Sequence, residues 1–295
     1  MNSVETFSTE TKEKMVIIGF LSLHVLGILS SIYWWNDFKA IDIVLFFTMY
    51  VLTGFGITIG YHRYFTHHSF KCKPWLRNLL LILGSMAGQG PLVYWVATHR
   101  RHHRFSDHEG DPHSPLLDKS SWFARVKSFW HAHMGWIFYM APEDYPTYAA
   151  DLYRDPHIIK MSYAYLFWLA LGLIIPAIIA GLWTQSWTGA WMGFVWGGLV
   201  RMAVGQHATW GINSVCHLFG KKNHTAKDNS RDNWLWGIIA LGEGWHNSHH
   251  AFPTSARHGL KWWQLDLSFL MIKLLEKFGA VWEIRLPHRE YKESA

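Results

Sequence analysis

Cysteine and charge are the two scarcest features of this chain. Only Cys72 and Cys216 occur among 295 residues, which is too few for a disulfide framework, and their separation does not match a thiolate metal site. Charged residues make up 16% of the chain, whereas hydrophobic residues make up 50% and include 19 tryptophans. That composition is too apolar for an ordinary soluble domain. Because the mean hydropathy is nevertheless near zero, we expect membrane spans balanced by a large water-facing body.

The chain also lacks the pattern of a secretory signal peptide. Its opening, MNSVETFSTETKEK, is polar, and no small-residue cleavage site follows the next apolar run. We interpret it as a short cytosolic tail. We find no internal repeat, no low-complexity tract and no second domain, so we expect one domain over residues 1–295.

Four apolar stretches are long enough to cross a bilayer, which takes ~20 residues at about 1.5 Å of rise each. Very short connections join the first two and the last two, which predicts two helical hairpins. The spans lie at about residues 15–34, 43–60, 161–183 and 187–208.

The distribution of basic residues orients these hairpins. The first short turn carries only Lys39 and the second carries none, whereas the long segments 62–160 and 212–295 are rich in Lys and Arg. Such residues accumulate on the cytoplasmic side. We therefore predict an all-α, multi-pass integral membrane protein, with both termini and a helical body (62–160 and 212–295) in the cytosol. Its expected surroundings are membrane lipids, and nucleic acid is not an expected partner.

Three further segments are apolar without being assigned as spans. The run from Trp75 to Ala97 could span by length, but Gly88, Gly90 and Pro91 interrupt it, so we predict helices within the cytosolic body that break near Gly90. Segments 121–138 and 262–279 alternate apolar and basic residues at helical spacing. They are either amphipathic helices at the membrane interface or core-facing helices of the body, and periodicity does not separate these two interpretations.

Histidine is abundant and clustered. In the pattern H-x-x-H-H, residues at i+3 and i+4 share a helix face with residue i at ~5–6 Å, so such a triplet can present several imidazoles to a metal pair. An H-x-x-x-x-H pair is ~140° apart on an α-helix, so it either serves different metals or straddles a helix end. Eight of the 20 histidines fall in three clusters: His62 and His67; His99, His102 and His103; His246, His249 and His250.

The size of this set indicates two metals. A tetrahedral zinc takes ~4 ligands, fewer than the clusters offer, and the spans contain none of the E-x-x-H pairs that soluble di-iron bundles use. Two redox metals at the edge of a bilayer indicate oxygen chemistry on a lipid-soluble substrate. We treat the other histidines, including His113 and His258, as non-ligands by default.

The clusters and their surroundings resemble the membrane fatty acid desaturases, in particular the stearoyl-type Δ9 enzymes that act on acyl-coenzyme A or acyl-lipid. The matching segments occur in the family's order over nearly the whole chain, to about His258: GYHRYFTHHSFK, ATHRRHHRFSDHEGDPHSP, WGINSVCHLFG and LGEGWHNSHHAFP. This resemblance implies a di-iron enzyme that uses O2 and two electrons to introduce a cis double bond, at Δ9, into a saturated acyl chain.

The resemblance also assigns the metal shell and the partners. It adds His217 as a ninth histidine and Asn213 as a ligand through water. It implies two Fe²⁺ ions, and a separate electron donor of the ferredoxin or cytochrome b5 type, since no haem-binding segment follows Leu286. The implied ligands are His62, His67, His99, His102, His103, Asn213, His217, His246, His249 and His250.

Several neighbouring residues receive secondary roles. A carboxylate often accepts a hydrogen bond from a metal-bound imidazole and so orients it. The candidates for this orienting role are Asp107, Glu109, Asp111 and Glu243. Arg201 lies inside the fourth span, where a lone charge costs ~2.5–3.5 kcal/mol, so it is either functional or a snorkelling or salt-bridged structural residue.

A tunnel for the acyl chain should end between the first two helices. The candidates for its closed end are Phe47, Tyr50, Leu52 and Gly54.

Two rival functions share the histidine clusters. A membrane di-iron hydroxylase or monooxygenase differs only in whether the second step removes hydrogen or returns oxygen. A histidine-rich metal transporter or sensor is disfavoured because the clusters lie beyond the ends of the spans.

Overall fold

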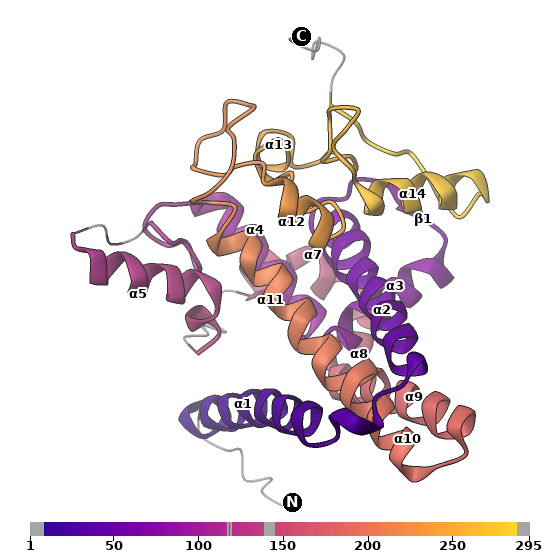
Figure 1. Ribbon diagram of the computed structural model, residues 1–295. Coiled ribbons are helices and arrows are strands. Elements are labelled where there is room, and N and C mark those ends of the chain that lie inside the picture. Colours follow the sequence, from indigo (N-terminus) through magenta and orange to yellow (C-terminus); the bar gives the residue numbers. More distant parts are fainter. Residues whose placement is uncertain (1–8, 117, 119, 139–144, 288–295) are drawn as a thin grey trace, which may run out of the picture.

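The computed structural model describes residues 9–116, 118, 120–138 and 145–287, and the described part is mostly helical (Figure 1). Two short strands, β1 (Lys71–Cys72) and β2 (Val281–Trp282), pair antiparallel. The helices, with 3₁₀ and π segments marked η, are α1 (Thr9–Tyr33), η1 (Trp35–Asp37), α2 (Ala40–Phe55), η2 (Gly56–Thr66), α3 (Pro74–Met86), α4 (Leu92–Phe105), α5 (Trp122–His133), η3 (Gly135–Phe138), α6 (Tyr145–Tyr148), α7 (Ala150–Tyr153), α8 (Pro156–Tyr163), α9 (Tyr165–Thr184), α10 (Trp187–Met192), η5 (Gly193–Val200), α11 (Arg201–Ser214), α12 (Trp234–Ile239), α13 (His246–Ala251) and α14 (Leu267–Lys277).

Two of the predicted spans have both the length and the hydropathy to cross a membrane. They are Ala40–Thr66, where α2 continues into η2, and Tyr165–Thr184. The apolar part of α1, Ile18–Tyr33, is shorter. The fourth predicted span forms one continuous helix, α10–η5–α11, whose mean hydropathy is lowered by Arg201 and by its glycine and tryptophan residues. The helical architecture is thus confirmed, together with two helices of spanning character.

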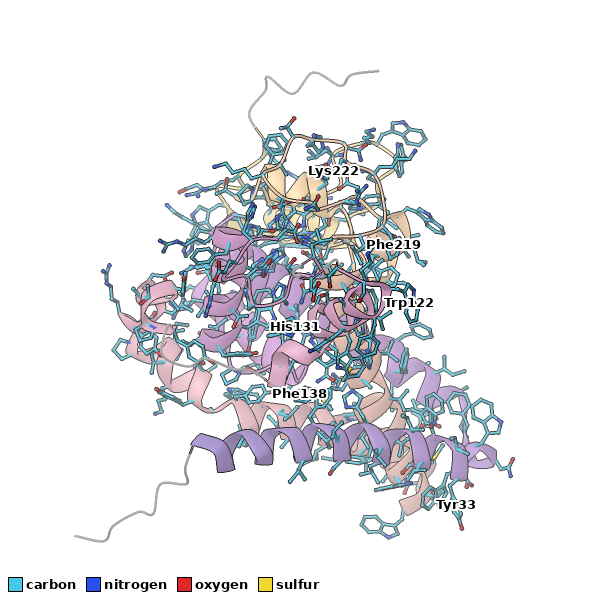
Figure 2. The ribbon with its side chains drawn as sticks, turned by 90° about the vertical axis from the view of Figure 1, so that its left-hand side faces the viewer. Tyr33, Trp122, His131, Phe138, Phe219 and Lys222 are labelled. Carbon is cyan, nitrogen blue, oxygen red and sulfur yellow. The ribbon has the colours of Figure 1, made fainter. Side chains whose placement is uncertain are left out.

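The first predicted hairpin differs from the expectation. In both views α1 lies across the long helices, whereas α2 and α11 run obliquely toward the body (Figures 1 and 2). α1 packs on η5, where a Cβ at Gly27 would lie 3.3 Å from the Cβ of Leu199. The chain turns through η1, and the Asp42 carboxylate then accepts from the Lys39 backbone N–H to begin α2. The second hairpin forms as predicted, because α9 packs along α10 and η5.

The charged loops and the first turn lie at opposite ends of the molecule. Figure 2 shows Lys222 at one end and Tyr33 at the other. The loop that follows α11 therefore extends away from the short turns, as the basic-residue pattern predicts.

The run from Trp75 to Ala97 breaks as predicted. α3 ends before Gly88 and Gly90, whose φ values of +74° and +95° favour glycine, and α4 begins after them. The two amphipathic segments show their apolar faces to the outside: Trp122, Phe123 and Trp130 on α5 are exposed, as are Leu270 and Phe278 at α14. This exposure favours the membrane-interface interpretation over the core-facing one.

Arg201 is neither snorkelling nor salt-bridged. Its side chain is fully buried and donates to three carbonyl oxygens on different helices, those of Gly197 at 3.0 Å, Met86 at 3.0 Å and Gly172 at 2.8 Å. All its acceptors among the described residues are neutral. The guanidinium therefore joins α11, α3 and α9 by satisfying the carbonyl oxygens that close packing leaves free.

We predict that Gly56→Ala destabilises the protein by about 1–3 kcal/mol or more, because overpacked cores resist added atoms. A Cβ there would lie 2.1 Å from the Gly84 backbone nitrogen, in the contact of η2 with α3. Thermal unfolding of the purified protein measures this. Gly19→Ala is the control, since no heavy atom lies within 4 Å of its added Cβ. Equal unfolding temperatures for the two variants would contradict the prediction.

Candidate metal centre

The first histidine pair lies on a π-helical segment. In η2, residues five apart are joined by hydrogen bonds, as from the His67 N–H to the His62 carbonyl at 3.1 Å, where η2 ends. One π-turn therefore separates the two residues, and their rings face one another with centroids 4.9 Å apart. Of the two alternatives that the spacing left open, the pair straddles the helix end. The 140° estimate was wrong because it assumed an α-helix.

Each H-x-x-H-H triplet divides its side chains between two groups. On α4, His99 and His103 point into one group while His102 points into the other. On α13, His249 joins the first group, and His246 and His250 join the second. In each triplet the histidines at positions i and i+4 thus belong to the same group, and the histidine at i+3 belongs to the other group.

All nine predicted histidines lie in these two groups, within which one ring nitrogen of each residue is within 4.8 Å of all the others. Group one consists of His62, His67, His99, His103 and His249, and group two of His102, His217, His246 and His250.

The nitrogens in these groups face each other closely. His62 Nε2 lies 3.0 Å from His249 Nε2, which lies 2.9 Å from His103 Nε2. In group two, His217 Nε2 and His246 Nε2 are 3.0 Å apart. The rings are buried, so a lone pair that meets another lone pair there needs compensation.

Four carboxylates fix which nitrogen carries the proton. An imidazole whose Nδ1–H donates to a carboxylate keeps its lone pair on Nε2. Nδ1 atoms approach carboxylate oxygens in four pairs: His62 and Glu243 at 2.5 Å, His102 and Asp111 at 2.9 Å, His217 and Asp107 at 3.0 Å, His250 and Asp228 at 2.5 Å. The Nε2 atoms of these four rings are therefore acceptors, and those of His102 and His250 have no hydrogen-bond partner among the described residues. A cation between the rings is the partner that they fit.

Three of the four predicted carboxylates contact the histidines. Glu109 does not, because its side chain is exposed. Asp228 was missed, since it lies in the loop after α11 and has no regular spacing to His250. Only the path of that loop brings the two together.

Two histidines treated by default as non-ligands lie against the centre. His113 is grouped with His102 and Asp111, and His258 with His62 and Glu243. His258 Nδ1 is 3.5 Å from Glu243 and His113 Nδ1 is 3.9 Å from Asp111. Both therefore face the supporting carboxylates, a position that their isolated places in the sequence did not signal.

Burial sets the charge of the centre. Burial first, and then neighbouring imidazoles, hold the pKa of His99 and of His103 well below the usual value, so these rings are neutral and can accept a metal. Burial raises the pKa of the Asp107 carboxyl, but its hydrogen bond and attraction to His217 outweigh this and lower it to about 2. The carboxylate is ionised at neutral pH.

A narrow, largely apolar cavity, here called the main cavity, leads to both groups. Its walls include Tyr50, Ile57, Met202 and Leu241, and it also reaches His62 and His246. A smaller hollow, the mouth hollow, is lined by Thr98, His113, Trp136 and Trp210 among others. The two spaces share Gln89, Trp95, His99, Thr209 and Asn213.

Hydrogen bonds stiffen this junction. Gln89 donates to Thr209 Oγ1 at 2.9 Å and accepts from Trp95 Nε1 at 3.3 Å. The predicted ligand Asn213 lines the same junction, beside the histidine groups. The structure thus places a largely apolar cavity against the histidine groups, with hydrogen-bonded polar side chains where the cavity meets the mouth hollow.

Comparison with known proteins identifies the architecture. The sequence profile named fatty acid desaturase matches residues 10–282. The chain belongs to the fatty acid desaturase family. Curated desaturases among its relatives include an sn-1 stearoyl-lipid 9-desaturase of Synechocystis, 38% identical over 92% of this chain and 80% of that one. Another sn-1 stearoyl-lipid 9-desaturase, of Anabaena variabilis, is 35% identical over 97% of this chain and 99% of its own length.

A third relative has a different name. The hex-5-enoyl-[acyl-carrier protein] acetylenase of Moorena producens is 44% identical over 87% of this desaturase chain and 81% of its own. The names of all three relatives describe the removal of hydrogen from an acyl chain. They differ in the molecule that carries the chain, a lipid or an acyl-carrier protein, and in the position of the bond that is oxidised.

We predict that Asp111→Asn weakens metal binding by about 10–100-fold, the usual effect of losing a carboxylate behind a ligating histidine. The variant loses the anion that accepts from His102 Nδ1. Metal retained during dialysis against increasing chelator measures the effect. Glu109→Gln is the matched control, because it removes an exposed charge from the same loop; equal retention by both variants would refute the role of Asp111.

Proposed function

We propose that this protein is an oxygen-dependent fatty acyl desaturase that introduces a cis double bond into a saturated acyl chain. The observation that carries the proposal is the main cavity, which is narrow and apolar and reaches two adjacent groups of inward-facing imidazoles. The apolar walls of this space suit a segment of a saturated acyl chain, and the histidine groups suit two metals.

The donor set fits iron. Neutral imidazoles suit several divalent metals, and iron is the one whose oxygen chemistry matches the family. His62, His67, His99, His103 and His249 would hold one ion. His102, His217, His246 and His250 would hold the other, and Asn213, which lines the main cavity together with His246, would complete the shell through water. Two iron ions would supply, with O2 and two electrons, the oxidation of unactivated methylenes that no side chain provides.

The side chains of this protein position the acyl chain. Gln89, Trp95 and Thr209 line both the mouth hollow and the main cavity, and we propose that an acyl chain passing between the two spaces bends there, beside the histidine groups. Fixing two neighbouring methylenes there supplies the orientation that the reaction requires. The apolar walls keep water away from the bend.

The double bond is proposed at Δ9, which rests on the names of two stearoyl-lipid 9-desaturases among the relatives. We also propose one domain with a cytosolic body, in which α10–η5–α11 is a third span beside the two long apolar helices. α1 lies across these helices (Figure 1) and would need a different course to be the remaining predicted span. The basic residues of that body support this orientation and would attract a separate acidic electron donor of the ferredoxin or cytochrome b5 type.

Two alternative functions would give other results in the experiment described below. A hydroxylase would use the same histidines and return oxygen to the chain. A metal transporter is disfavoured because both groups are held in the body by buried carboxylates, with no path of ligands along the spans.

We predict that the chain, expressed in a desaturase-deficient host, produces monounsaturated fatty acids, and that His249→Ala abolishes them while the protein is still present. His249 is expected to be essential because its Nε2 lies between those of His62 and His103. Gas chromatography with double-bond localisation gives the readout. His157→Ala is the control, since that exposed histidine contacts Asn78 outside the centre.

Hydroxylated chains from an iron-loaded, electron-supplied wild type would instead favour the monooxygenase. Unchanged unsaturated product in the His249 variant would remove the assigned metal centre.

We predict that Gly54→Val shifts the products toward shorter acyl chains by roughly 10-fold, the discrimination that a methylene in an apolar pocket gives. Gly54 lines the main cavity, and its added Cβ would lie 2.6 Å from Leu241 Cδ1. Fatty acid profiles of the same host measure this shift. Leu52→Phe is the control, because Leu52 is on the exposed face of the same helix. A shift toward shorter chains in the Leu52 variant alone would contradict the assignment of Gly54 as the residue that limits chain length.

A further inference from the structure

A second apolar cavity, here called the side cavity, lies on the other face of α11. It has a volume of about 480 Å³ and is a partly open space bordered by α1, η5, α11, α12 and the end of α5, and its lining residues Ile28 and Val204 are exposed. Ile28, Val200, Ala203 and Val204 supply apolar wall. Ligand pockets typically measure ~300–1,000 Å³, so the side cavity is large enough for an organic ligand, and none of the metal-centre histidines lines it.

The side cavity runs beside the main cavity. Ala208 and Ile239 line both, so at that place one small and one medium side chain separate the two spaces. The cavities approach again near the mouth hollow, where the ring of His207, in the side cavity, lies 5.3 Å from that of Trp210, in the mouth hollow. A molecule with two arms could therefore place one in each space.

Two of the polar side chains that line the side cavity, His133 and His207, lie together. His133 Nε2 and His207 Nδ1 are 2.9 Å apart, and His133 Nδ1 is 2.9 Å from Ser214 Oγ. No Asp, Glu, Lys or Arg lines the cavity among the described residues. The imidazoles suit uncharged acceptors such as ester carbonyls, and the remaining wall suits hydrocarbon.

We propose that the side cavity binds the second acyl chain of a two-chain glycerolipid while the first chain occupies the main cavity. The ester-linked backbone of the lipid lies near His207, between the two spaces. This assignment rests on the proposed desaturase function and names its substrate class. An acyl thioester has a single chain and would leave the side cavity without an occupant.

The test compares three substrates with the full-length, iron-loaded, electron-supplied protein in bilayers. They are a diacyl glycerolipid with a stearoyl chain, its one-chain lysolipid, and a stearoyl thioester. Ala203→Phe fills the side cavity from a residue that does not line the main cavity. Ile178→Phe is the control, as it adds an aromatic ring at an exposed position of α9.

We expect Ala203→Phe to lower desaturation of the diacyl lipid by roughly 10-fold or more relative to the lysolipid, because a filled pocket rejects the chain that it would hold. The control should keep the wild-type ratio. Two-chain lipid that is retained during purification, counted by mass spectrometry, should fall in the Ala203 variant and not in the control, independently of activity.

Three results overturn the assignment while the desaturase function stands: equal losses on diacyl lipid and lysolipid, a wild type that prefers the thioester, or unchanged lipid retention. A wild type that forms no double bond in any of the three substrates overturns the proposed function itself.

Discussion

Compensation of buried imidazole lone pairs is the constraint on which the rest of the body depends. Carboxylates accept the Nδ1 protons of His62, His102, His217 and His250, which leaves the lone pairs of these four rings on Nε2. The Nε2 atoms of His102 and His250 are buried and have no hydrogen-bond partner among the described residues. Such an arrangement is unfavourable unless cations lie between the rings. The helices η2, α4 and α13 must therefore be held at fixed separations, because a small displacement would spoil several ligand positions at once.

One buried ion network supplies part of that rigidity. Arg63, in the same π-segment as His62, is fully buried and donates to Glu243 at 3.1 Å, to Asp266 at 2.9 Å and to the carbonyl of Ala256 at 2.8 Å. Glu243 thus pairs with the arginine and orients His62. Removing one partner of such a network commonly costs ~3–5 kcal/mol. The arginine ties the end of the spanning helix to the C-terminal body and holds His62 in place.

Sequence periodicity predicted which histidines lie together better than it predicted their arrangement. The spacing of His99 and His103 is visible because a regular α-helix places i and i+4 together. For His62 and His67 the sequence left two alternatives, and it could not choose between them because a π-segment, which brings i and i+5 together, depends on tertiary packing. Asp228 lies on an irregular loop, and its approach to His250 has no local signature. The crosswise course of α1 likewise depends on where its small residues meet η5.

Helix α11 borders both cavities and ends beside the histidine groups. Its end leads directly to Asn213 and His217, one face borders the main cavity, and the opposite face borders the side cavity. Ala208 belongs to both walls, so any change in its volume alters two spaces. Arg201 fixes the start of the same helix against α3 and α9. If His217 binds a metal as proposed, this helix is held at one end by buried hydrogen bonds and at the other by the metal, so it resists the shift that a bulkier chain would require. Under the two proposals above, the shapes of the two cavities, more than the chemistry of their walls, would then determine which acyl substrate is accepted.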